Sequence, residues 1–169
     1  MRRIATSLAL VALCGFAASC AGADRQGTAA QQMTSWVKGT SYGATQRTLV
    51  ADAKKAAVVL STGTPAEIHT VCGVFLVDVE QANGVLPTPD QQATDLLSTS
   101  YTALGGAAHN CFDAPGSPAK RASFAVNKSK GLAALSEATG RIEAVLGIPL
   151  AQVGGATEGV TGGTTGNTP

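Results

Sequence analysis

The chain has 169 residues, with 12 Lys and Arg against 11 Asp and Glu. This near-neutral charge gives no support to a nucleic-acid partner, and one Trp, two Tyr and four Phe provide no platform for stacking single-stranded bases. A chain of this length can bury one self-sufficient core, so we expect a single folded domain.

The first twenty residues have the pattern of an export signal. Arg2 and Arg3 precede a largely apolar run over residues 4–18, which is too short to remain as a span of a bilayer core about 30 Å thick. The small residues directly before Cys20 resemble the lipobox of bacterial lipoprotein precursors. That resemblance implies a signal peptide over residues 1–19, cleavage before Cys20, diacylation of its thiol and a lipid anchor in the cell membrane.

A second interpretation of the leader stays open. Ala21, Gly22 and Ala23 form the small-x-small pattern that signal peptidase I accepts, and cleavage after them would release a secreted protein without lipid. Both interpretations predict an extracytoplasmic location.

Residues 20–40 are predicted to be an N-terminal tether that ends in a short amphipathic segment. In that segment, Met33, Trp36 and Val37 are expected to cover one end of the helical domain.

Helix starts are the clearest structural signal in the rest of the chain. A hydroxyl residue followed by proline occurs three times, at Thr64, Thr88 and Ser117. The hydroxyl can accept a hydrogen bond from the N3 amide, and proline is tolerated at N1 because its missing N–H has no intrahelical partner there. Glu67 and Gln91 would complete capping boxes after Thr64 and Thr88.

Apolar residues recur every three or four positions after each start, as expected for helices that bury one face. The predicted helices cover residues 41–61, 65–84, 89–111 and 118–146. Because the loops between them are short, consecutive helices should be antiparallel neighbours. We therefore predict an all-α fold, an antiparallel four-helix up-and-down bundle over residues 41–150. The Gly- and Thr-rich residues 151–169 are predicted to be a disordered tail.

Cys72 and Cys111 are the only cysteines outside the leader and the lipidation motif. In an oxidising compartment they are expected to form a disulfide. Cys72 and Cys111 lie at different distances from the connection between their helices, so the connecting segment has to make up this difference along the helix axis. The alternatives are two reduced, buried thiols or a thiolate metal site, although no Cys-x-x-Cys spacing occurs.

The charges are divided along the chain. No Lys or Arg lies between Lys55 and Lys120, where six acidic residues occur, and the helices on either side of this stretch carry an excess of basic residues. The basic helices are expected either to face an anionic surface or to pair with their acidic neighbours.

His69 and His109 are the only histidines, and each lies within one turn of a cysteine of the predicted disulfide. Together with Glu67 and Asp113 they are candidates for binding zinc, copper or haem. No Glu-x-x-His pair, His-Glu-x-x-His or Cys-x-x-Cys-His motif accompanies them.

The sequence favours a non-catalytic domain tethered to the cell envelope that binds an unidentified envelope protein or polymer. No enzyme activity and no cofactor are predicted, because no nucleophile-base constellation or phosphate-binding glycine loop occurs. The alternative is an extracytoplasmic carrier that holds a metal, haem or lipid within the bundle.

Overall fold

The computed structural model describes residues 27–153, and within this range the chain contains helices but no strands. The predicted signal peptide, Cys20 and residues 154–169 lie outside the described residues. The helices, in chain order, are α1 (Ala29–Gly39), α2 (Tyr42–Thr62), α3 (Pro65–Asn83), α4 (Gln91–Phe112), α5 (Pro118–Leu146) and α6 (Leu150–Val153).

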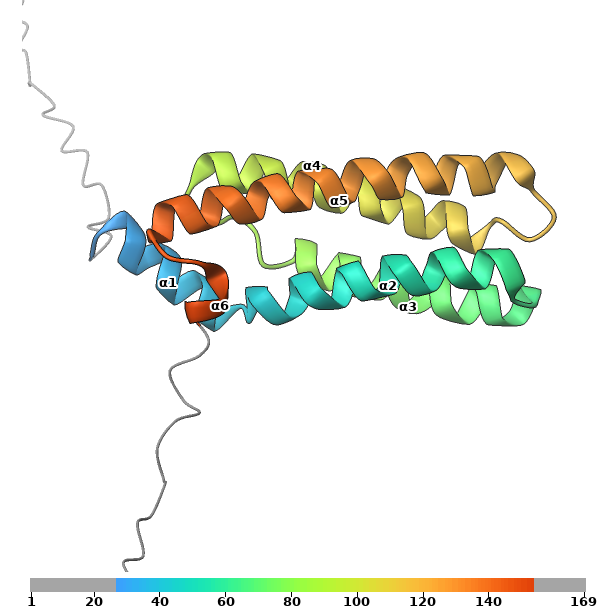
Figure 1. Cartoon of the computed structure of the whole chain (residues 1–169), viewed down its shortest axis with the longest axis horizontal. Coiled ribbons are helices and arrows are strands. Elements are labelled where there is room, and N and C mark those ends of the chain that lie inside the picture. The colour runs from blue at the N-terminus through green and yellow to red at the C-terminus, as the bar shows by residue number, and fades with distance from the viewer. Residues whose placement is uncertain (1–26, 154–169) are drawn as a thin grey trace, which may run out of the picture.

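The four long helices lie along the long axis of the molecule, with α2 beside α3 and α4 beside α5 (Figure 1). The most extensive packing joins α4 to α5, and α3 links the two pairs through its contacts with α4. The short helices α1 and α6 lie together at one end (Figure 1). The prediction of an all-helical fold is confirmed.

Two of the three predicted helix starts are confirmed in detail. At Thr64 both halves of a capping box are present: its Oγ1 accepts a hydrogen bond from the Glu67 amide at 3.3 Å, and its own amide donates to Glu67 Oε2 at 2.7 Å. Ser117 caps α5, with its Oγ 3.3 Å from the Lys120 amide nitrogen. Local capping chemistry therefore sets where these helices begin.

The predicted capping box at Thr88 is wrong, because α4 begins at Gln91 and its N-cap is Asp90. The Asp90 carboxylate accepts from the Ala93 amide at 2.8 Å and binds Arg141 of α5 through two hydrogen bonds of 2.6 and 3.0 Å. The Thr88 hydroxyl instead accepts from the Asp90 amide at 3.1 Å. A carboxylate that caps a helix and also pairs with an arginine is more favourable at this position than a threonine hydroxyl.

The predicted apolar stripes form the core. Leu49, Phe75, Leu97, Leu104 and Leu135, which lie within the four predicted helices, are among the large side chains that are fully buried. Leu86 and Leu132 are only partly buried at its edge. Helical periodicity thus identified which face of each long helix is turned inward.

The folded domain extends beyond the predicted boundaries at both ends. Met33 and Val37 of α1 are buried, and the Trp36 indole donates a hydrogen bond to the Val85 carbonyl at 3.2 Å. The amphipathic segment therefore covers one end of the long helices. At the other terminus, Val153 of α6 is buried, so the prediction of a tail starting at residue 151 is wrong for its first three residues.

Candidate functional site

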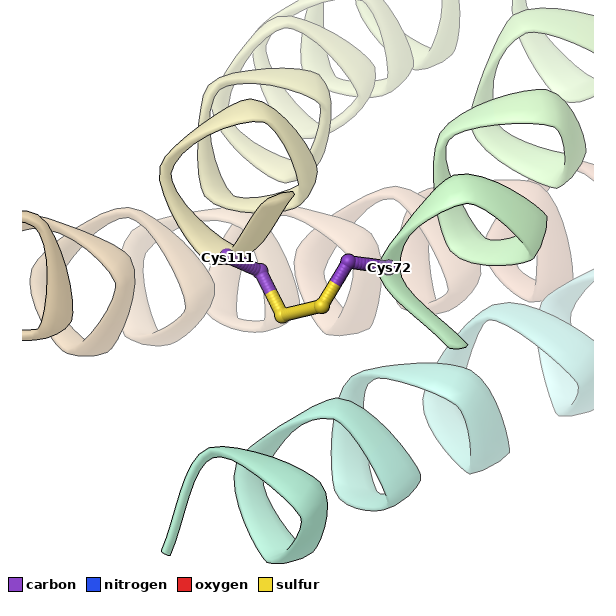
Figure 2. The surroundings of a disulfide bond; sticks show 2 residues. All are labelled: Cys72 and Cys111. Atoms are coloured by element: carbon purple, nitrogen blue, oxygen red, sulfur yellow. A yellow bond between two sulfur atoms is a disulfide. The ribbon is translucent and has the colours of Figure 1, made fainter. Parts of the chain in front are cut away.

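The disulfide joins Cys72 of α3 to Cys111 of α4 in the interior of the molecule (Figure 2). Both cysteines are fully buried, and their Cα atoms are 5.7 Å apart. Residues 84–90 extend beyond the end of α3 before α4 runs back beside it (Figure 1). Cys72 and Cys111 therefore lie at the same height along the two helices. The structure thus contains the predicted disulfide and the connecting segment that its register requires.

The structure does not assemble the predicted histidine site. His69 is exposed and stacks on Phe112, with ring centroids 4.6 Å apart, and His109 is exposed on α4. Glu67 is occupied in the cap of α3, and Asp113 binds Lys120 at 3.2 Å. Within residues 27–153, no group of three or more His, Cys, Asp or Glu side chains is placed to hold a metal ion.

Some of the oppositely charged residues form ion pairs between neighbouring helices. The Asp90–Arg141 and Asp113–Lys120 pairs both connect α5 to the ends of α4, as expected if opposite charges favour helix pairing. The Asp90–Arg141 contact also lowers the pKa of the Asp90 carboxyl group, because the guanidinium donates hydrogen bonds to its charged form.

Other basic side chains do not form such ion pairs between helices. Arg47 and Lys54 of α2 and Lys130 of α5 are exposed, and they form no ion pair with any residue of the described range. In Figure 1, α2 and α5 lie in front of α3 and α4. We call the α2–α5 side the basic side and the α3–α4 side the acidic side.

A pair of carboxyl groups between α2 and α3 was not predicted from the sequence. Asp52 is only 4% exposed; its Oδ1 accepts from Lys55 at 3.3 Å, and its buried Oδ2 has no hydrogen-bond partner among the described residues. Asp78 of α3 is a neighbouring carboxyl group whose electrostatic interaction with Asp52 raises the Asp78 pKa. One signal was present: Asp52 falls three residues after Leu49, on the buried stripe of α2.

The Asp78 carboxyl group has a raised pKa. Burial is the largest cause, and the neighbouring Asp52 carboxyl group raises the pKa further, whereas Lys55 lowers it. Neighbouring carboxylates repel each other, which favours the protonated form of Asp78 in the folded state.

Asp78→Asn is expected to make the protein more stable than the parent near neutral pH. Protonated Asp78 contributes its full stabilisation below the pKa of an unfolded aspartate, which is about 4. This stabilisation is lost as the pH rises through the raised pKa of Asp78 in the folded protein. The advantage of Asp78→Asn should therefore shrink as the pH falls from about 7 toward about 4.

Urea unfolding followed by circular dichroism at several pH values measures this difference. Glu80→Gln is the matched control, because Glu80 is exposed on the same helix. An advantage of Asp78→Asn that is the same at every pH would contradict a raised pKa of Asp78 in the folded state.

None of the helices among the described residues is both long enough and apolar enough to cross a membrane. Comparison of the chain with protein-family models, with curated proteins and with solved structures finds no match.

Proposed function

We propose that this chain is a non-catalytic exported lipoprotein, tethered to the cell envelope through a lipid on Cys20, and that its basic side binds another envelope component. In this proposal the four long helices act as an antiparallel up-and-down bundle, a rigid support for the charged surface. The short connections and the packing of each long helix on the next favour this arrangement.

The observation that supports binding is the set of exposed cations on the basic side. Arg47, Lys54 and Lys130 are free of ion pairs within the described residues, while exposed Glu80 and Asp95 lie on the acidic side. Separated charges of this kind orient a protein against an anionic surface, and each Lys or Arg near such a surface contributes about 1 kcal/mol. Phospholipid headgroups and anionic wall polymers both have the complementary charge.

The position of α1 agrees with the proposed anchor. This helix covers one end of the long helices, and residue 20 precedes it by nine positions, so a lipid on Cys20 would hold this end of the domain near the membrane. Mass spectrometry of the mature amino terminus tests the lipid. A chain that starts at an unmodified Asp24 would instead establish simple secretion.

Replacing Arg47, Lys54 and Lys130 together by glutamine is expected to weaken binding of the unlipidated chain to anionic vesicles or wall material by roughly 100-fold, from about 1 kcal/mol per cation. Sedimentation of the bound protein at low and high salt measures the effect. A Glu80→Gln, Asp95→Asn variant is the matched control from the acidic side and should bind at least as well as the parent. Binding that is indifferent to all three cations would contradict a role for the basic side.

Absorption spectra and metal analysis of the purified chain distinguish this proposal from the carrier hypothesis. We expect no stoichiometric ligand. A metal or haem that is lost when His69 and His109 are both replaced by alanine would establish a carrier in place of an envelope-binding domain.

A further inference from the structure

A hollow of about 520 Å³ lies where the end of α2 meets the start of α3. Val58, Val59 and Val71 contribute its apolar surface, and Lys54 and Lys55 lie at its edge. Val58 is 64% exposed, so it adds uncovered apolar surface to the hollow. Lys54 precedes Val58 by one helical turn, so a positive charge and an exposed apolar group share one face of α2.

The charges around this hollow favour an anion. Lys54 forms no ion pair within the described part of the chain, and the side chain of Lys55 is 69% exposed although it contacts Asp52. The one carboxylate that lines the hollow, Glu67, accepts hydrogen bonds from the Thr64 amide and hydroxyl at 2.7 and 2.8 Å. Its charge is therefore directed toward the cap of α3.

A second helix adds basic groups at the same end of the molecule. The Arg121 guanidinium of α5 donates a hydrogen bond to the Leu60 carbonyl of α2 at 2.8 Å, which fixes this cation two residues beyond Val58 along α2. Its sequence neighbour Lys120 is paired with Asp113 at 3.2 Å, so Arg121 is the cation that α5 adds at this end. Apolar surface next to lysine side chains is the combination found where proteins enter the boundary between lipid headgroups and acyl chains.

We propose that this hollow, which we call the valine hollow, is a docking site for anionic phospholipid, with Val58 entering the acyl boundary and Lys54 pairing with a lipid phosphate. The inference rests on the proposed function, names the partner, and adds an apolar contact at the edge of the basic side, where α2 meets α3 and Lys54 lies. The valine hollow lies at the end of α2 far from α1 (Figure 1). A lipid on Cys20 and the valine hollow would therefore be two separate attachments that lay the domain along the membrane.

Val58→Ser tests the apolar part of this contact without altering charge. Val126→Ser is the matched control, because Val126 is 66% exposed but lies on α5, outside the valine hollow. Binding of the unlipidated full chain is measured on vesicles of phosphatidylcholine alone and of phosphatidylcholine with about one third phosphatidylglycerol. We expect Val58→Ser to weaken binding to the anionic vesicles by about five- to tenfold, as loss of one buried aliphatic side chain predicts, and Val126→Ser to leave it unchanged.

Each other outcome overturns the inference in a distinguishable way. If Val58→Ser binds like the parent while loss of Arg47, Lys54 and Lys130 abolishes binding, the basic side acts through charge alone and only the proposed function stands. If neither change matters, both proposals fail. If Val58→Ser instead abolishes self-association in sedimentation experiments and no vesicles are bound, the valine hollow is an interface between copies of this chain.

Discussion

Replacing Cys72 and Cys111 together by alanine is expected to lower the free energy of unfolding by about 3–4 kcal/mol. The disulfide closes a loop with a sequence separation of 39, so its loss increases the conformational entropy of the unfolded chain. Both cysteines are also fully buried in the core, and alanine in place of each leaves a small void there. This loss is a large fraction of the 5–15 kcal/mol that is typical of folded domains.

Urea denaturation followed by circular dichroism measures the effect of the double replacement. The parent protein with the disulfide chemically reduced is the control, because it keeps both sulfur atoms in the core and loses only the covalent link. It should be destabilised by nearly as much as the variant. A loss below about 1 kcal/mol in both would show that the denatured chain is not appreciably constrained by this bond.

Gly131→Ala and Gly140→Ala, two changes of one methyl group on the same helix, are expected to have opposite effects on stability. A Cβ at Gly131 would lie 2.7 Å from Cγ and Cδ2 of Leu104 and 3.0 Å from its backbone nitrogen. Leu104 is fully buried and cannot move aside, so we expect Gly131→Ala to cost about 1–3 kcal/mol. A Cβ at Gly140 would meet nothing within 4 Å, so Gly140→Ala should stabilise the protein by up to about 1 kcal/mol through helix propensity.

The same denaturation experiment compares the two glycine variants directly. The contact at Gly131 is reinforced by the Ser100 hydroxyl, which donates to the Gly131 carbonyl at 2.9 Å inside the core. Among the glycines of α4 and α5, Gly131 is the one at which an added Cβ would lie less than 3 Å from the neighbouring helix. If Gly131→Ala is as stable as the parent, the two helices can separate without cost and this explanation is wrong.

Local patterns in the sequence were enough to predict most of the helices. The helix predicted over 118–146 matches α5, and the one predicted over 65–84 differs from α3 by a single residue. Proline at N1, a capping hydroxyl and apolar spacing act within a few residues of each other, so they can be recognised without knowledge of the fold. The disulfide was predictable for a related reason, since only two cysteines were available.

The errors arose where a distant residue decides the outcome. Thr88 has the local features of an N-cap, but Arg141, 51 residues after Asp90, favours Asp90 in that role. Aspartate is a residue type usually found at the surface, yet packing of α3 on α2 buries Asp52 near Asp78. The histidines are near the disulfide in sequence, but both are exposed, His69 stacks on Phe112, and no group of three or more metal-binding side chains forms among the described residues.

The amino-acid sequence by itself determined the positions of the long helices, their buried faces and the pairing of Cys72 with Cys111, because capping, periodicity and the number of cysteines are independent of the fold. Only the tertiary structure decided which charges pair, which carboxylate is buried and which valines surround a hollow beside lysines. These features depend on contacts between helices, and such contacts are established by the packing of the whole chain.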